Sequence, residues 1–455
     1  MLCQSERQHL AEASRKFFLH GFASPETEAL VDRILLSTGR QNKRACILMP
    51  RLVVWLVVSM SLFRSSSILN VFERLITWTK ECGPMPRRGI VSEEAVYHAR
   101  SRLGALPLKL LFRELSPKPK ELPASYSGLR VFGIDGTNFN VPDTAKNAAV
   151  FRRHTSQNRP AAYPQVQGVF LSELSTHQLV DCCYMPCLSN EISTIPFLLK
   201  NLGAGDLLLL DRGFASFKTL SLCQRRGVNF LVRVHKNWKP AYKKKLGNGD
   251  HLVDLKPTGK ARDEFGSKPL PVRLLEFTIG ESKIIRLATN LTNPMVYCAL
   301  DLARLYHRRW ECEVTYKEMK SELLLTGRTK MPTHFRSKSP IGVLQECWGM
   351  AVAHLLTRHL MVCGAIAESL PPLSLSFTSS LATIKTWLPR FQRKRRKGFR
   401  NALVRDIGNC KIDRPRRPRR FPRVVKRAKG RVVTKNETHK ETPLDLTVRF
   451  HPRAS

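Results

Sequence analysis

The sequence has few acidic residues for its length, and this shortage is its most informative feature. Its 455 residues include 36 Asp and Glu against 76 Lys and Arg, so the formal net charge is +40 and the pI is near 10.4. A positive field of that size needs a polyanion or an anionic surface as partner, and nucleic acid is the commonest such partner. On charge alone, a ribosome-associated or membrane-surface protein is the alternative.

The chain also lacks a secretion signal and an apolar run long enough to cross a membrane. The opening MLCQSERQHL has no basic region that leads into an apolar stretch, as a signal peptide would. One apolar run lies between Arg51 and Arg64, but it falls short of the ~20 residues that span a bilayer. We therefore expect this run to be a buried core helix, and we expect a cytoplasmic protein with no membrane partner.

Paired cysteine motifs are missing as well. The twelve cysteines are scattered, and the tightest group is Cys182, Cys183 and Cys187. That group has neither the CxxC pairs nor the following histidines that zinc sites use. We expect reduced thiols in the core or at the surface, which is the default for a cytosolic protein.

The first 120 residues have the pattern of helices. In the stretch 91–104, Ser92 is placed to cap the helix start and Gly104 to end the helix. A Pro-rich stretch at 116–125 then marks a domain boundary. We predict an all-helical, DNA-binding N-terminal domain over residues 1–120.

After the linker the chain changes to short apolar strands that alternate with helices. Three strands, a helix, a strand, a helix and a strand predict an α/β core with a mixed sheet. The strands fall at 129–135, 163–174, 177–185, 206–214 and 229–234, and the helices at 189–203 and 216–227. A turn-rich module follows before a buried strand at 283–291 resumes the pattern. We predict one α/β domain over residues 126–385, with a β-rich insertion at 235–283.

The end of the chain is strongly basic. Residues 391–435 hold nineteen Lys and Arg against two Asp. Because this composition cannot bury a core, we predict a disordered C-terminal tail over residues 386–455 that grips nucleic acid. Arg100 and Arg102, near the end of an N-terminal helix, could also contact DNA phosphates or could be solvated helix surface, and we favour the surface.

Two aspartates stand at the ends of apolar strands. They are Asp135 in VFGIDGT and Asp211 in LLLLDRGF. Ligands and chemistry gather at the carboxyl ends of strands in open α/β sheets. A turn aspartate is the simpler explanation for either residue alone, because Asp is a frequent turn former. Two such strand ends in one predicted sheet favour a functional site.

The stretch LYHRRWECEVTYKEMK at 305–320 has an unusual helical face. At 100° per residue, one face of about 100° combines aromatic, basic and acidic side chains, whereas Glu311 and Glu318 point elsewhere. This face carries Tyr306, Arg309, Trp310, Glu313, Lys317 and Lys320. The mixture suits neither a hydrophobic core nor a solvated surface. An ion pair between Arg309 and Glu313, four residues apart, is the structural alternative.

A metal-dependent site on nucleic acid explains the mixture. Hard cations such as Mg²⁺ take oxygen ligands, and a few carboxylates can hold two of them. Two such ions can activate the attacking oxygen and stabilise the leaving oxygen of a phosphodiester. On this hypothesis Asp135, Asp211 and Glu313 form the metal-binding catalytic triad. The basic and aromatic residues of the helix face hold the DNA.

These motifs together resemble the DDE transposases of bacterial insertion sequences, in the insertion-sequence-four family. That family has a Y-(2)-R-(3)-E-(6)-K signature, and Tyr306, Arg309, Glu313 and Lys320 match its spacing without a gap. IDGT and LDRGF resemble the first and second aspartate motifs of the family. The interrupted layout and the helical N-terminal segment are similar too, so the resemblance covers roughly residues 30–360.

The resemblance implies an RNase H-like catalytic domain that cuts and rejoins DNA at the inverted repeats of its own element. It implies two Mg²⁺ ions, with Mn²⁺ as a possible substitute, and a homodimer assembled on two paired DNA ends. It also implies a bacterial, nucleoid-associated protein. Some members form a DNA hairpin and stack a flipped base on an aromatic residue. Trp238 is a candidate for that residue, although packing in the insertion is the simpler explanation.

Two rival functions stay open on the sequence. A nuclease of the same fold would need the same three carboxylates, so only strand-transfer products separate it from a transposase. A decayed or domesticated, non-catalytic nucleic-acid-binding protein would keep the charge but not need the triad.

Overall fold

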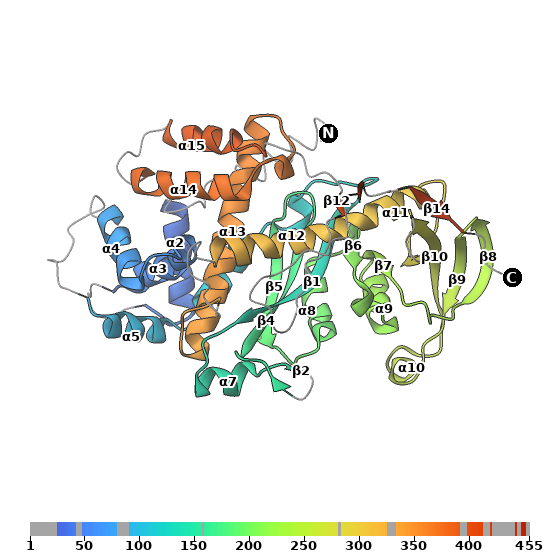
Figure 1. Ribbon diagram of the computed structural model, residues 1–455, viewed down its shortest axis with the longest axis horizontal. Coiled ribbons are helices and arrows are strands. Elements are labelled where there is room, and N and C mark those ends of the chain that lie inside the picture. Colours follow the sequence, from blue (N-terminus) through green and yellow to red (C-terminus); the bar gives the residue numbers. More distant parts are fainter. Residues whose placement is uncertain are drawn as a thin grey trace.

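The computed structural model describes residues 25–41, 48–79, 91–156, 159–280, 284–324, 334–391, 398–412 and 447–451, with two short strands at 419–420 and 442–443. Helices from the two ends of the chain gather at one side of the molecule, and a long sheet extends away from them (Figure 1). The first 24 residues and most of the predicted basic tail lie outside the described residues.

The described part of the N-terminal segment is helical, as predicted. Its helices are α2 (Pro25–Ser37), α3 (Pro50–Leu62), α4 (Ile68–Thr79), α5 (Glu93–Leu103) and α6 (Leu106–Leu115). Helix α5 begins where the Ser92 hydroxyl accepts a hydrogen bond from the Ala95 N–H (3.1 Å). It ends at Gly104, whose φ of 69° lies in the region that favours glycine.

The arginines near the end of α5 lie in different surroundings, and the favoured surface position is wrong for one of them. Arg100 is buried, and its guanidinium donates to Gln345 (3.2 Å), Ser337 (2.9 Å) and the Gly342 carbonyl (3.2 Å). Arg102 is exposed. Only the tertiary packing of α5 on α13 distinguishes the two.

A single long helix, α13 (Pro340–Ala367), organises the core. It is long and apolar enough to cross a membrane, but 83% of its most apolar window is buried inside the protein. Helices α3, α6, α14 (Phe377–Phe391) and α15 (Phe399–Gly408) pack against it. The apolar run of α3 is therefore a buried core helix, as expected.

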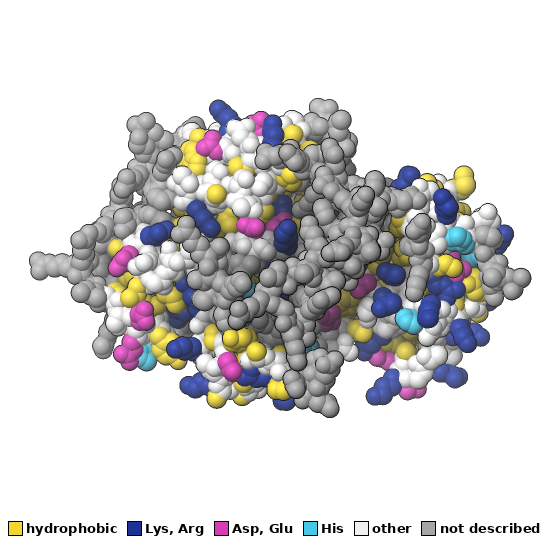
Figure 2. All heavy atoms as spheres, viewed as in Figure 1, with side chains coloured by type: hydrophobic (Ala, Val, Ile, Leu, Met, Phe, Trp, Pro, Cys, Tyr) yellow, Lys and Arg dark blue, Asp and Glu magenta, His cyan; other side chains and the backbone are white. Residues whose placement is uncertain are grey.

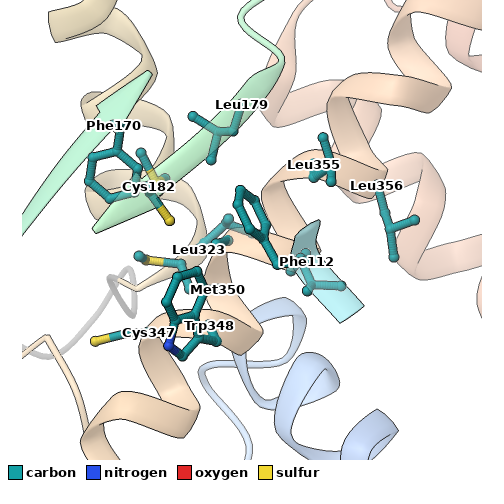
Figure 3. Close-up of a cluster of buried hydrophobic side chains, with 14 of the residues drawn as sticks. Phe112, Phe170, Leu179, Cys182, Leu323, Cys347, Trp348, Met350, Leu355 and Leu356 are labelled. Carbon is teal, nitrogen blue, oxygen red and sulfur yellow. The ribbon is translucent and has the colours of Figure 1, made fainter. Parts of the chain in front are cut away.

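Figure 3 shows the contact between α13 and the rest of the core. Trp348 and Met350 of α13 meet Phe112 of α6 and Phe170 of strand β4 (Gln165–Glu173) in one hydrophobic cluster. The Trp348 and Phe112 ring centroids are 5.6 Å apart. This cluster continues across the Pro-rich linker, so the N-terminal helices share a core with the α/β part of the chain.

The central sheet is mixed and RNase H-like. Its strands are β1 (Arg130–Asn140), β4 (Gln165–Glu173), β5 (Leu179–Pro186), β6 (Asp206–Leu210) and β7 (Asn229–Arg233), in the spatial order β5-β4-β1-β6-β7. β1, β4 and β5 form an antiparallel meander, and β6 and β7 lie parallel to β1. Helices α8 (Ile195–Leu198) and α9 (Phe217–Arg225) follow β5 and β6.

The β-rich insertion extends the same sheet. Its strands are β8 (Ala241–Gly247), β9 (Asp250–Leu255) and β10 (Leu270–Ile279). They join the sheet through β11 (Ile285–Thr289), the buried strand predicted after the insertion, in the order β7-β11-β10-β9-β8. The short helix α10 (Lys260–Phe265) joins β9 to β10. Trp238 is only partly buried and packs on a core cluster beneath this region, which supports the packing explanation for it.

The two faces of the sheet belong to different clusters, which fixes the direction of every side chain on β1. Val131 belongs to the cluster shared with α13, whereas Phe132 belongs to the cluster under α9. Successive side chains of a strand point to opposite faces. Odd-numbered residues near the start of β1 therefore face α12 (Glu311–Lys317) and α13.

The predicted disordered tail is wrong where the structure describes ordered elements within residues 386–455, of which α15 and β14 make the contacts that follow. Helix α15 falls within the basic segment, but Leu403, Val404 and Ile407 are buried against α13, beside Gly364. Strand β14 (Val448–Phe450) adds to β10 at Phe277–Ile279. Short apolar patterns inside an arginine-rich stretch supply enough burial to order these pieces, which overall composition does not reveal.

Candidate active site

Asp135 lies in the middle of β1, and not at a strand end as predicted. Strand β1 continues to Asn140 because it keeps pairing with β4, although its pairing with β6 stops at Ile134. Alternation from Val131 points the Asp135 side chain toward the α12 face. The Gly136 N–H donates to Oδ1 of Asp135 (2.8 Å), which fixes the carboxylate.

Asp211 follows directly on β6 and lies beside Asp135. Ile134 of β1 is paired with Leu210 of β6 in parallel register, so the next residue on each strand is an aspartate. Asp211 starts a short 3₁₀ turn, η5 (Arg212–Phe214). The register of two neighbouring strands therefore brings the two predicted aspartates together.

Glu313 comes from an interrupted helix, so the assumption of one regular helix was wrong. The segment consists of α11 (Ala299–His307), the 3₁₀ turn η6 (Arg308–Trp310), α12 and the π-helical turn η7 (Glu318–Leu323). Helix α12 lies directly on β1, where Gly133 leaves room for the Cys312 thiol. Glu313, next to Cys312, has a side chain that is 41% exposed.

Arg309 joins the first and last of the three predicted carboxylates. Its guanidinium lies 3.6 Å from Oδ2 of Asp135 and 3.2 Å from Oε1 of Glu313. The predicted ion pair between Arg309 and Glu313 is thus present, together with a second one to Asp135. A cation therefore already occupies the space between these two carboxylates.

The Tyr306 hydroxyl forms a hydrogen bond within the protein. It donates to the Leu210 carbonyl (3.1 Å), and burial raises the pKa of Tyr306. Lys320 also reaches back to the sheet: its ammonium donates to the Thr137 hydroxyl (2.6 Å) and lies 5.2 Å from the centre of the Phe139 ring. These side chains join the interrupted helix to β1 and β6.

The remaining two predicted DNA-binding residues face outward. Trp310 is 56% exposed, and the Arg309 guanidinium lies 5.9 Å from the centre of its ring. Lys317 is exposed on the last turn of α12. The six residues thus divide into an inner group, which contacts the sheet or the carboxylates, and an outer pair.

The surroundings of Asp135 disfavour the ionised form of its carboxyl group. Burial raises the pKa of Asp135 to about 6, Glu191 and Asp211 add to the shift, and the Gly136 N–H and Arg309 oppose it. Sequence reasoning missed Glu191, because a glutamate in the first turn of a helix is an ordinary helix-start residue. Glu191 lies near Asp135 only in the folded chain, because 55 residues lie between them in the sequence.

The carboxylates fit a divalent cation by the chemistry of their donor atoms. Asp135, Asp211 and Glu313 offer only oxygen, the donor that hard divalent cations take. Within the described ranges, however, no three His, Cys, Asp or Glu side chains are gathered closely enough to hold an ion by themselves. Arg309 stands where a cation would neutralise two of them.

Glu318, which the sequence had excluded as an active-site acid, is buried in a polar network. It accepts hydrogen bonds from Arg358, whose Nε is 2.9 Å from Oε2, and it lies 3.0 Å from Nε2 of His354. His177 lies between it and Glu311, with nitrogens 3.2 Å from Glu318 and 2.8 Å from Glu311. This network fixes the far side of the interrupted helix to α13 and to the β4–β5 turn.

Two family models match this chain on either side of the Pro-rich linker. "Insertion element 4 transposase N-terminal" matches residues 19–113. "Transposase DDE domain" matches residues 126–356, which include Asp135, Asp211 and Glu313.

Two curated bacterial proteins are similar to the chain. It is 31% identical over 425 residues to the "Transposase InsG for insertion sequence element IS4" of Escherichia coli (strain K12), across 90% of this chain and 91% of that protein. It is 28% identical over 193 residues to the "Putative transposase InsZ" of the same strain, across 41% of this chain and 62% of that protein. Among solved structures, a piggyBac transposase synaptic complex with hairpin DNA is similar at a TM-score of 0.41 and 12% identity, over 87% of this chain and 85% of that one.

Proposed function

Since this chain belongs to the insertion element 4 family and is a DDE transposase that acts on DNA, we propose that Asp135, Asp211 and Glu313 are its catalytic, metal-binding residues. The observation that carries the proposal is the parallel register of β1 and β6, which sets Asp135 beside Asp211. Arg309 adds Glu313 to the pair, because it contacts both Asp135 and Glu313.

The enzyme depends on a divalent metal, as its DDE domain implies. We propose two Mg²⁺ ions, with Mn²⁺ as a substitute, because the donors are carboxylate oxygens and Mg²⁺ keeps several waters. When bound, such ions activate an attacking oxygen and stabilise a leaving oxygen at phosphorus. The protein's own part is to hold three carboxylates on one side of the sheet and to keep Arg309 beside them.

The proposed reaction has two phosphoryl-transfer steps at each end of the element. In the first, a water oxygen bonds to phosphorus and the 3′ oxygen leaves as a free hydroxyl. In the second, that 3′ oxygen attacks a phosphodiester of the target and displaces another 3′ oxygen. Each step exchanges one P–O bond for another, so no external energy source is needed.

The inner and outer residues of the interrupted helix have separate proposed roles. Trp310 and Lys317 are exposed, so they contact DNA directly, the indole by stacking and the ammonium at a phosphate. Lys320 turns toward the DNA from its contact with Thr137, and Arg309 orients the carboxylates. The Tyr306 hydroxyl is occupied by Leu210, so we propose a positioning role for it in place of a DNA contact.

Basic surfaces outside the active site supply the remaining contacts with DNA. Figure 2 shows Lys and Arg side chains over the face of the insertion, and β8 exposes Lys243, Lys244 and Lys245 in sequence. Such contacts bind phosphates without reading bases. We propose that the N-terminal helices recognise the element's terminal repeats. We also propose that a homodimer pairs two ends and inserts them into target DNA at the nucleoid of a bacterial cytoplasm.

The test uses purified full-length protein, Mg²⁺ and a plasmid that carries the element's own ends. Wild type is compared with Asp135→Asn, Asp211→Asn and Glu313→Gln, and cleavage and strand transfer are read on gels. Glu311→Gln is the matched control, because Glu311 lies on the same helix but contacts His177 on the other side. The three variants should bind ends and not cut, whereas the control should cut.

Two results would contradict parts of the proposal. Cleavage that survives Glu313→Gln removes Glu313 from the triad. Cleavage without strand transfer by wild type indicates a nuclease of this fold, and binding without cleavage indicates a non-catalytic relic of the family.

A further inference from the structure

Glu191 is a fourth carboxylate beside the two aspartates. It is the first residue of the 3₁₀ turn η3 (Glu191–Thr194), which follows β5. The Asn190 side chain caps this turn by accepting a hydrogen bond from the Ile192 N–H (3.0 Å). The Glu191 carbonyl in turn accepts from the Thr194 hydroxyl (2.7 Å). The backbone that carries Glu191 is therefore fixed from both directions.

Gly136 makes the approach of Glu191 possible. A Cβ added at Gly136 would lie 2.2 Å from Oε1 of Glu191 and 2.6 Å from its carboxyl carbon. Gly136 is an extended residue of β1 paired with Val169, so the glycine is needed there for space and not for its backbone angles. The Glu191 carboxylate thus rests on the backbone of β1 at the residue after Asp135, and it approaches from the sheet face opposite the one toward which Asp135 points. Beyond Ile134, β1 is no longer paired with β6, so the two faces meet at this edge of the strand.

The Glu191 carboxylate is oriented but not neutralised. The Gln167 amide donates to its Oε1 (2.6 Å), and Gln167 carries no charge. Glu191 forms no ion pair with any residue in the described ranges, while Asp211 lies close enough to raise its pKa along with burial. Asp135, Asp211 and Glu191 thus lie near enough for their negative charges to repel one another, and the Arg309 guanidinium lies 3.6 Å from the first of them.

We propose that Glu191 is a further metal-binding carboxylate of the active site and that Gln167 is the residue that positions it. This inference rests on the proposed function, because it adds a ligand to the metal site that Asp135 and Asp211 form. Glu191 and Gln167 also line a cavity of about 420 Å³ that Gly213 and Phe214, just after Asp211, help to form. Neither Asp135 nor Asp211 lines this cavity, so it offers room for the waters of a hydrated cation on the Glu191 side of the site only.

The first measurement follows Mn²⁺ binding to the full-length protein, without DNA, by the loss of the free-ion EPR signal. Glu191→Gln keeps the shape and the Gln167 contact, and it should weaken Mn²⁺ binding about tenfold, the lower end of what lost metal-site contacts cost. Gly136→Ala should weaken it similarly, although it retains every carboxylate, because the added methyl group displaces the Glu191 side chain. Glu264→Gln is the charge-matched control, since Glu264 pairs with Lys218 on the exposed surface.

A second measurement separates a metal ligand from a merely structural residue. In EDTA, Glu191→Gln should melt at a higher temperature than wild type because it removes like-charge repulsion, and Mn²⁺ should then raise its melting temperature less. A structural role predicts a lower melting temperature both with and without metal.

The outcomes distinguish this inference from the proposed function. If Asp211→Asn loses Mn²⁺ binding and Glu191→Gln retains wild-type affinity, the role of Glu191 is overturned and the metal site of the triad stands. If neither substitution changes Mn²⁺ binding, the proposed metal site itself is wrong. Weaker binding in Glu191→Gln and Gly136→Ala, with Glu264→Gln unchanged, supports the inference.

Discussion

The Tyr306 hydroxyl donates a hydrogen bond to the carbonyl of Leu210, the residue immediately before Asp211. This contact joins the end of α11 to the end of β6, so the helix that leads to Glu313 is tied to the strand that carries the second aspartate. Tyr306 therefore sets the spacing between two parts of the site from within the protein.

Tyr306→Phe should lower stability by about 1 kcal/mol, the usual net value of one such hydrogen bond. It should slow DNA cleavage and leave binding to the element's ends unchanged. Denaturant unfolding, a cleavage assay and a gel-shift assay measure the three quantities. Tyr316→Phe is the control, because the Tyr316 hydroxyl is buried with no hydrogen-bond partner in the described structure. A loss of DNA binding in Tyr306→Phe at unchanged stability would show that the phenol contacts DNA.

Gly133→Ala should push α12 away from β1, because the new Cβ would lie 2.4 Å from the Cys312 sulfur. We expect a stability loss of about 1–3 kcal/mol, typical of overpacking, and a strong loss of cleavage as Glu313 moves. The double variant Gly133→Ala with Cys312→Ala should recover much of the stability and of the cleavage activity, because the smaller side chain at 312 makes room for the new methyl group. Gly203→Ala is the control, since nothing lies within 4 Å of a Cβ there. Failure of the double variant to recover would indicate that Gly133 matters for another reason.

Glu318→Gln should destabilise the protein by about 3–5 kcal/mol, because it leaves the buried Arg358 without its carboxylate. Burial opposes the charge of Glu318, but Arg358 and His177 keep its pKa well below the usual value. Urea unfolding measures the loss. The variant Glu318→Gln with Arg358→Met should be more stable than Glu318→Gln alone. Exposed ion pairs such as Lys218–Glu264 contribute less than about 1 kcal/mol. A loss of stability in that range for Glu318→Gln would contradict the role of the buried network.

Arg309→Gln should lower stability in EDTA by about 1–2 kcal/mol, between the values for exposed and buried ion pairs. Mg²⁺ should recover part of the loss, because it replaces the missing cation near Asp135 and Glu313. Thermal unfolding with and without Mg²⁺ checks both points. Arg308→Gln serves as control, because Arg308 lies in the same turn and, among the contacts described, its guanidinium donates only to the Ser125 carbonyl (3.4 Å). Equal destabilisation in both buffers would separate Arg309 from the metal site.

Two buried histidines should make the folded protein less stable in acid. Burial lowers the pKa of His334 to about 4, with help from Lys320 and Arg64, and burial lowers that of His359 to about 3. The unfolded chain takes up these protons near pH 6.5 and the folded chain does not. Their stabilisation is therefore complete above pH 6.5. It declines as the pH falls toward the folded-state pKa, by about 3 kcal/mol in all for His334 and about 5 kcal/mol for His359.

Thermal unfolding between pH 7.5 and 4 measures this dependence. His334→Gln and His359→Gln should each flatten the curve, whereas His98→Gln, which changes an exposed side chain of α5, serves as the matched control. Curves that stay parallel to that of wild type would mean that both imidazoles titrate normally in the folded protein.

Several features of this protein followed from the sequence alone. Local spacing was sufficient for the helical N-terminal segment, for the mixed α/β core and for the family, because caps, apolar periods and the Tyr306–Lys320 signature lie within short stretches of chain. Asp135 and Asp211 were also found locally, since each interrupts or ends an apolar strand. The roles of the site residues remain predictions until the triad is tested.

The tertiary structure decided everything that depends on register or on close approach. The pairing of Ile134 with Leu210 places Asp135 beside Asp211, and β1 keeps Asp135 in mid-strand because β4 continues to pair with it. The sequence treated 305–320 as one regular helix, but a 3₁₀ turn and a π turn redirect its side chains. Glu191 reaches β1 only because Gly136, 55 positions earlier in the chain, has no side chain. Contacts between distant segments arise from packing, and periodicity within a segment carries no information about them.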